Sequence, residues 1–101
     1  MRRALVLEEA VQDLEAARDF YDAREIGVGG YCVDSLLSDI GSLSLFHGIH
    51  PVHFTYHRML ASRFPFGIYY ADTVKQTRVV AVLDLRRDPS WIHREIRRRS
   101  S

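Results

Sequence analysis

The sequence has one cysteine, one lysine and no long apolar run. Because Cys32 has no second cysteine to pair with, a disulfide within the chain is excluded and a reducing, cytoplasmic setting is expected. Its helical surroundings, without a partner base, favour a packing role over that of a nucleophile. The longest aliphatic run, "VVAVL", is far shorter than the roughly 20 residues that span a bilayer. The start, "MRRALVLEEA", has too few apolar residues for a secretory signal, so no membrane partner is expected.

The 101 residues suit a single domain, residues 1–101, and 47% of them are hydrophobic. Charge is divided unevenly between the two halves. Residues 1–50 carry four arginines and nine acidic residues, a net charge of −5. Residues 51–101 carry nine arginines and one lysine against four acidic residues, a net charge of +6. This asymmetry indicates that the second half meets a negatively charged partner, either nucleic acid or an acidic protein segment.

Hydrophobic spacing predicts a short strand over Arg3–Leu7 and two amphipathic helices after it. The first helix runs from Glu8 to about Gly27, and the second from about Tyr31 to Leu45, closed by Gly48 and Pro51. The first buries Ala10, Leu14, Ala17 and Tyr21, with Val11 and Phe20 widening the stripe. The second has an apolar face of Val33, Leu36, Leu37, Ile40 and Leu43, and a polar face of Asp34, Ser35, Ser38, Asp39 and Ser42. A glycine-rich link joins them into a helical hairpin.

Three strands are expected next, within residues 54–62, 64–72 and 77–87. Asp88 and Pro89 then predict the start of a last helix. The order β-α-α-β-β-β-α describes an α+β, two-layer domain in which the helical hairpin packs on a mostly antiparallel sheet. Only the short last helix is left for the second sheet face, which is therefore expected to be partly open.

The segment "FPFGIYY" alternates cleanly. Phe64, Phe66, Ile68 and Tyr70 are expected to face the helical hairpin, whereas Tyr69 points the other way. Pro65 cannot donate a ladder hydrogen bond and suits a strand entrance. Gly67 is predicted to leave the second face open.

Several segments together resemble the RelE/ParE superfamily, the toxins of bacterial type II toxin–antitoxin systems. They are "EEAVQDLEAARDFYDAREIGVGGYCVDSLLSDIGSL", "HRML", "FPFGIYY" and "VVAVLDLRRDPSWIHR", in the order found in the family and spanning nearly the whole chain. The most specific is the proline-aromatic strand followed by a valine-rich strand that ends in "RRDPSW". The resemblance implies the α+β fold, neutralisation by a cognate antitoxin, and a role in plasmid stabilisation and growth inhibition. No cofactor is expected.

The resemblance offers two kinds of target. RelE-like members cleave messenger RNA on the ribosome, whereas ParE-like members poison DNA gyrase and lack the nuclease residues. Gly67 stands where the nuclease strand has arginine, which favours the ParE-like branch and a protein that is not an enzyme. For the ribonuclease alternative, His57, Arg58 and Arg87 are the candidate catalytic residues, because RNA cleavage needs an acid or base and cations for the phosphate.

Antitoxin or target binding is predicted for six residues: Arg58, Arg63, Tyr69, Arg86, Arg87 and Trp91. Arginine suits this role because its planar guanidinium binds carboxylates and phosphates with paired hydrogen bonds. The alternative role for Arg58 is a salt bridge to an aspartate. The alternative role for Arg87 is a salt bridge to Asp88. Asp84 stands where ParE-like relatives often have histidine, so the local charge is reversed.

The histidines at 47, 50, 53 and 57 are interpreted as incidental loop residues, and no metal site is predicted, because no Cys or Glu completes a tetrahedral set. The arginines at 97–99 are expected to form a solvated, frayed tail. A further alternative is a small RNA-binding module in which Tyr56 and Tyr69 stack on bases across an exposed sheet.

Overall fold

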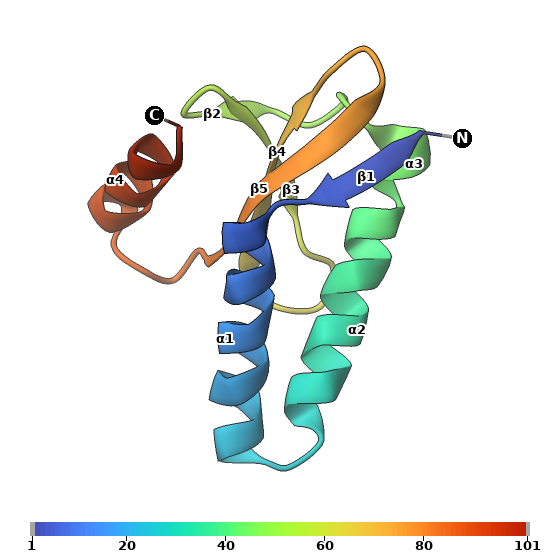
Figure 1. The fold of residues 1–101 in the computed structure, drawn as a ribbon. Helices are drawn as coiled ribbons and strands as arrows, with labels where there is room; N and C mark the ends of the chain where they lie inside the picture. Colours follow the sequence, from blue (N-terminus) through green and yellow to red (C-terminus); the bar gives the residue numbers. More distant parts are fainter. Residues whose placement is uncertain (1, 101) are drawn as a thin grey trace.

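In the computed structural model, which describes residues 2–100, a five-stranded sheet is covered on one face by a helical hairpin and on the other by a short helix (Figure 1). The strand order is β1-β5-β4-β3-β2. The strands are β1 (Arg3–Val6), β2 (Val52–His53), β3 (Tyr56–Leu60), β4 (Phe66–Asp72) and β5 (Gln76–Asp84). Only the β1–β5 pair is parallel. The predicted α+β fold with a mostly antiparallel sheet is confirmed, and strand β2 is an addition to it.

The hairpin consists of α1 (Glu8–Arg24) and α2 (Val28–Gly41), followed by a short α3 (Leu43–Phe46). The prediction for α1 is confirmed, but the start of the second helix at Tyr31 is wrong. The Asp22 carboxylate accepts hydrogen bonds from the backbone N–H groups of Gly27 and Gly29, at 3.1 and 2.7 Å. A Cβ on Gly29 would lie 2.2 Å from the carbonyl oxygen of Arg18, so only glycine permits this close helix contact.

The main core lies between this hairpin and the sheet. Phe66, Ile68 and Tyr70 face the hairpin, as predicted from the alternation of the strand. The predicted faces of α2 need one correction, because Leu37 is 45% exposed whereas Ser35 is buried. The buried face of α2 instead follows Cys32, Leu36 and Ile40, at a spacing of four residues. The packing role predicted for Cys32 agrees with its complete burial.

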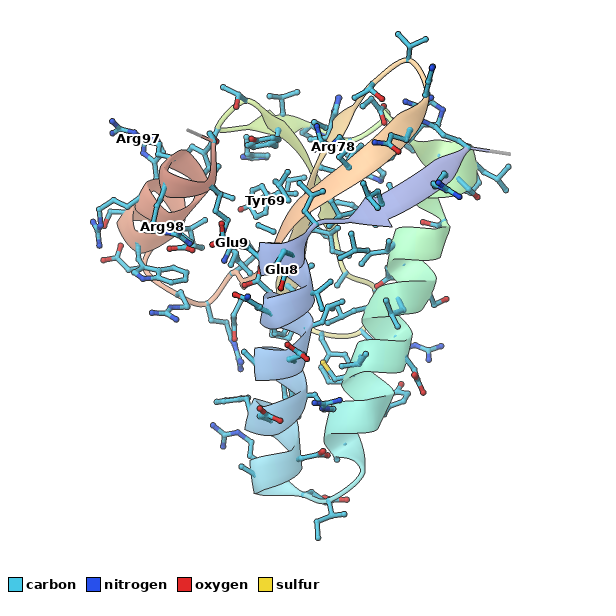
Figure 2. All side chains as sticks on the ribbon, viewed as in Figure 1. Glu8, Glu9, Tyr69, Arg78, Arg97 and Arg98 are labelled. Atoms are coloured by element: carbon cyan, nitrogen blue, oxygen red, sulfur yellow. The ribbon has the colours of Figure 1, made fainter. Side chains whose placement is uncertain are left out.

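The second face of the sheet is covered by α4 (Pro89–Arg99), which begins at Asp88 as predicted. Ile92 and Ile96 pack on Tyr69, Ala81 and Leu83. Tyr69 is only 1% exposed and lies between α4 and the sheet (Figure 2). The expectation of an open face is therefore wrong around Tyr69.

A β-bulge brings a further apolar residue to this second face. Tyr69 pairs with Ala81 and Tyr70 with Val79, so the register shifts at Val80. A bulge of this kind places two consecutive residues on one side of a strand. Val80 and Ala81 consequently both join the cluster beneath α4. Within residues 2–100 no helix has both the length and the apolar character needed to cross a membrane.

Candidate functional site

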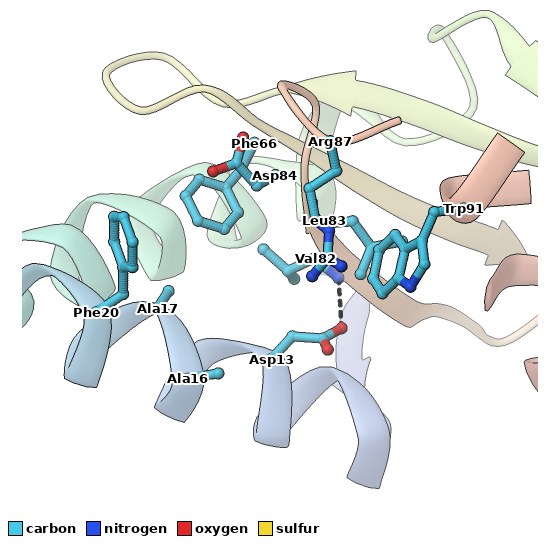
Figure 3. A pocket seen from close by; sticks show the side chains of 10 residues that line it. All are labelled: Asp13, Ala16, Ala17, Phe20, Phe66, Val82, Leu83, Asp84, Arg87 and Trp91. Atoms are coloured by element: carbon cyan, nitrogen blue, oxygen red, sulfur yellow. Dashed lines mark hydrogen bonds between the residues drawn. The ribbon is translucent and has the colours of Figure 1, made fainter. Parts of the chain in front are cut away.

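A groove runs between α1, the end of β5 and the first turn of α4 (Figure 3). Its volume is about 350 Å³. The small side chains of Ala16 and Ala17 leave room along α1, while Phe20 closes one end. The lining residues, which define this α1–β5 groove, are Asp13, Ala16, Ala17, Phe20, Phe66, Val82, Leu83, Asp84, Arg87 and Trp91. The groove is therefore mostly apolar, with charged groups at its rim.

Two of the residues predicted to bind a partner come together on this rim. The guanidinium carbon of Arg87 lies 3.6 Å from the centre of the Trp91 ring, in a cation–π contact. Stacking of this kind fixes the plane of the guanidinium while leaving its N–H edge free to donate. The expected pairing of Arg87 with Asp88 is not formed; Asp88 instead accepts from the Ser90 amide and hydroxyl.

The acidic end of the groove is neutralised by the neighbouring arginine. Arg86 donates to both carboxylate oxygens of Asp84, at 3.0 Å from Nε to Oδ1 and 2.7 Å from Nη2 to Oδ2. These hydrogen bonds hold the pKa of Asp84 below its ordinary value, against the opposing effect of burial. Asp84 thus stays ionised and already carries a partner. The guanidinium of Arg86 is therefore already paired with Asp84.

On the other wall, Asp13 pairs with Arg99 from the end of α4. Two terminal nitrogens of Arg99 donate to Asp13, at 2.6 and 2.8 Å, and Arg99 also donates to the carbonyl oxygen of Val80. Asp13 in turn accepts from the Val82 amide at 2.9 Å. Strand β1 pairs with β5 only as far as Val79. Beyond that point, Asp13 and Arg99 supply the hydrogen-bond partners for the backbone edge of β5.

The expectation of a solvated, frayed tail is wrong for two of its three arginines. The Arg99 side chain is only 8% exposed. Burial alone would lower its pKa, but the hydrogen bonds and charge of Asp13 and Glu95 raise it. Arg98 pairs with Glu9 of α1 and with Glu95. These contacts anchor the end of α4 to α1.

Gly67 does not leave the second face open, which corrects the prediction from the sequence. A Cβ at this position would lie 2.9 Å from Cδ2 of Leu85 and 3.2 Å from Cδ of Arg58. Arg58 is paired opposite Tyr69 on the neighbouring strand, so the two side chains share one sheet face. The aliphatic part of Arg58 therefore occupies the space that a side chain at Gly67 would need.

The two remaining residues predicted to bind a partner lie elsewhere. Arg63 is exposed in the loop before β4 and donates to the hydroxyl of Tyr31 on α2, at 3.3 Å. Tyr69 is buried beneath α4, where it cannot contact a partner while α4 is in place. This burial also removes Tyr69 from the base-stacking role considered for an open sheet.

The candidate nuclease residues are not brought together. His57 stacks on Tyr70, with ring centres 5.1 Å apart, on the face that meets the hairpin. Arg58 is the next residue of the strand and points to the opposite face. Arg87 lies beyond β5, on Trp91. These three side chains therefore do not converge on one point, as joint action on a phosphate would require.

Three of the four histidines of residues 47–57, namely His47, His50 and His57, belong to a polar cluster beside Tyr70. His50 Nδ1 lies 2.5 Å from the Tyr70 hydroxyl, and His47 Nδ1 lies 3.0 Å from Asp72. Burial raises the pKa of Tyr70. Within residues 2–100, no three His, Cys, Asp or Glu side chains are arranged to hold a metal ion. The cluster fixes the loop between α3 and β2 to the sheet.

Of the residues that line the groove, the sequence pointed to Arg87 and Trp91 as binding residues and missed the others. Ala16 and Ala17 are adjacent small residues on α1. Such a pair is the sequence pattern that could have indicated a groove, because another segment can approach closely there. Asp13 could not be identified, because its partner Arg99 lies 86 residues away.

No protein-family model matches the chain, and no curated protein matches it. A solved chain from the chromosomal ParDE TA system of P. aeruginosa is similar in structure, with a TM-score of 0.73. The match covers 81% of this chain and 94% of the other, at 16% sequence identity. At that identity the likeness establishes the fold. The RelE/ParE-like fold inferred from the sequence is therefore confirmed.

Proposed function

We propose that this chain is the toxin of a type II toxin–antitoxin module and is neutralised by a cognate antitoxin. The observation that carries the proposal is the fold match to a chain of a ParDE TA system, which extends over 94% of that chain. The sequence segments that resemble this superfamily span nearly the whole chain. Function does not follow from a fold alone, so the groove supplies the second line of support.

The α1–β5 groove has the chemistry of a docking site for an antitoxin segment. Its floor of Ala16, Ala17 and Val82 can receive apolar side chains, which would lose contact with water there. Arg87 offers its N–H edge to a carboxylate of the partner. Arg86 is less available, because Asp84 already binds it. We propose Arg87 and Trp91 as central contacts, with Arg58 and Arg63 as outlying ones.

The proposed mode of action is poisoning of DNA gyrase, or of another macromolecular target, without nuclease chemistry. Two observations favour it over the ribonuclease alternative. Gly67, which stands where the nuclease strand has arginine, is packed against Leu85 and Arg58. His57 and Arg58 lie on opposite faces of β3, so the candidate acid or base is separated from its cation. The ribosome is accordingly a less favoured partner.

The test is induced expression followed by two parallel assays on the same cells. We expect growth to stop while messenger RNA stays intact, with plasmid supercoiling lost or gyrase trapped on DNA. Purified protein should then inhibit supercoiling by gyrase in vitro. Cleaved messages with unaffected gyrase would support the ribonuclease alternative instead. Unimpaired growth at high expression would contradict the toxin assignment.

A further inference from the structure

The turn between β2 and β3 has an unusual composition for its geometry. Two residues, Phe54 and Thr55, connect the paired positions His53 and Tyr56. Their φ angles are +56° and +73°. Two-residue hairpins with both angles positive normally use Asn-Gly or Asp-Gly, and a β-branched threonine is a clear outlier there. A strained turn that persists in this form indicates a compensating contact or a function for its side chains.

The compensating contact is made by Phe54. Its ring stacks on the imidazole of His93 in α4, with ring centres 4.5 Å apart and planes inclined by 13°. Phe54 remains 38% exposed, and His93 is also exposed. The strained turn thus holds an aromatic ring against the last helix while part of both rings faces solvent. We name this pair the Phe54–His93 platform.

Cationic side chains adjoin the platform. Arg97 lines one hollow together with Phe54 and His93, and a second hollow together with Arg94 and Arg98. Arg98 is held by Glu9 and Glu95, so part of its charge is offset. Arg94 and Arg97 are exposed and form no salt bridge within the described residues. The platform and these two arginines therefore form one continuous basic and aromatic surface on α4.

We propose that this surface binds single-stranded nucleic acid, with a base stacked on the Phe54–His93 platform and the backbone phosphates on Arg94 and Arg97. Aromatic rings beside arginines are the combination that proteins use for single strands, because every base has a stacking face and every linkage a charge. An acidic protein segment could use the arginines but would leave the platform without a role. In a duplex the bases are stacked on each other and cannot reach the platform.

This surface is separate from the α1–β5 groove and does not rest on the proposed toxin function. It also differs from the RNA-binding module considered from the sequence, which used the sheet face that α4 covers. Arg97 lies on α4, away from Arg78 at the other end of the sheet (Figure 2). Lys75 and Arg78 are exposed as well and serve as a matched control for charge.

The test measures fluorescence anisotropy of labelled oligonucleotides of about 12 nucleotides, a length within the usual site size of such proteins. Single-stranded RNA, single-stranded DNA, duplex DNA and a labelled polyglutamate peptide form four arms, each titrated over a range of salt concentrations. Four proteins are compared: wild type, Phe54→Asn, Arg94→Ala/Arg97→Ala and Lys75→Ala/Arg78→Ala. Asparagine is favoured in such a turn, so Phe54→Asn removes the ring without weakening the hairpin.

We expect one or both single strands to bind more tightly than the duplex. Phe54→Asn should weaken binding by about tenfold. Arg94→Ala/Arg97→Ala should weaken it and reduce the salt slope by roughly 1.4, the value for two phosphate contacts on a single strand. Lys75→Ala/Arg78→Ala should bind like wild type. The proposal is overturned by absent binding at low salt, by equal losses in both double variants, or by a preference for a polyglutamate peptide.

Discussion

The carboxylate of Asp13 on α1 binds the guanidinium of Arg99 at the end of α4, through contacts of 2.6 and 2.8 Å. The two residues are 86 positions apart and lie almost entirely out of solvent, at 13% and 8% exposed. Through this pair the last helix is joined to the first, and the unpaired edge of β5 receives its hydrogen bonds. The pair therefore links helices that lie on opposite faces of the sheet.

Removal of one partner of this pair should cost about 3 kcal/mol of unfolding free energy, because it leaves a buried charge without its bidentate partner. We expect Asp13→Ala and Arg99→Ala each to show such a loss in urea denaturation followed by circular dichroism. Glu9→Ala, which removes a more exposed carboxylate, should cost about 1 kcal/mol or less. The double variant Asp13→Ala/Arg99→Ala should lose much less unfolding free energy than the sum of the two single losses. Additive losses would show that the pair is not coupled.

Gly67 should resist replacement for steric reasons. Gly67→Val is expected to cost about 1–3 kcal/mol, because its side chain meets Leu85 and Arg58 in a filled space. Leu85→Ala should relieve part of this cost when it is combined with Gly67→Val. Gly67→Arg should not create RNA cleavage, because no open face awaits the new side chain. A stable Gly67→Val protein, measured by thermal unfolding, would contradict the packing described for this strand.

The histidine cluster should make stability depend on pH. Burial, and then the nearby charge of His57, lower the pKa of His50 from its ordinary value of 6.5. Below pH 6.5, His50 binds a proton more readily in the unfolded chain than in the folded protein. The free energy of unfolding therefore falls as the pH falls from 6.5 towards the folded pKa.

The variant His50→Asn retains a polar group near the Tyr70 hydroxyl but cannot titrate. Its melting temperature should therefore decline less than that of wild type between neutral pH and pH of about 5. Thermal unfolding of both proteins across this range provides the comparison. Identical profiles would mean that His50 does not contribute to the pH dependence.

The sequence predicted the parts of the fold that depend on local patterns. The spacing of Ala10, Leu14 and Ala17 located α1, and the alternation around Ile68 identified its strand and the face it buries. The start of α2 was missed, because the glycines before Tyr31 resemble a linker, whereas Asp22 reaches across from α1 to bind their amides. Side-chain contacts between distant segments leave no periodic signal.

In the candidate site too, contacts between residues close in sequence could be predicted, and contacts between distant segments could not. Arg87 and Trp91 are four residues apart at a helix start, so their proximity follows from local structure. The sequence predicts a solvated tail that includes Arg99, because a run of three arginines has no visible partner in it. Only the folded chain brings Asp13 to it. Tyr69 was expected to be accessible, and its burial depends on how α4 folds back over the sheet.

The groove offers a matched pair of variants for the central claim. Ala16 lines the α1–β5 groove, whereas Ala23 is exposed on the same helix outside it. Ala16→Trp should fill the groove with an indole ring. Ala23→Trp introduces the same side chain away from it and controls for effects on folding and expression.

The most direct measurement is growth of cells that express wild type, Ala16→Trp or Ala23→Trp, each alone and together with the protein encoded by the neighbouring gene, which we expect to be the antitoxin. We expect wild type and Ala23→Trp to stop growth alone and to be neutralised when the antitoxin is present. Ala16→Trp should stop growth in both conditions, because the antitoxin can no longer enter the groove. Normal growth with wild type alone, or equal neutralisation of all three proteins, would contradict the account.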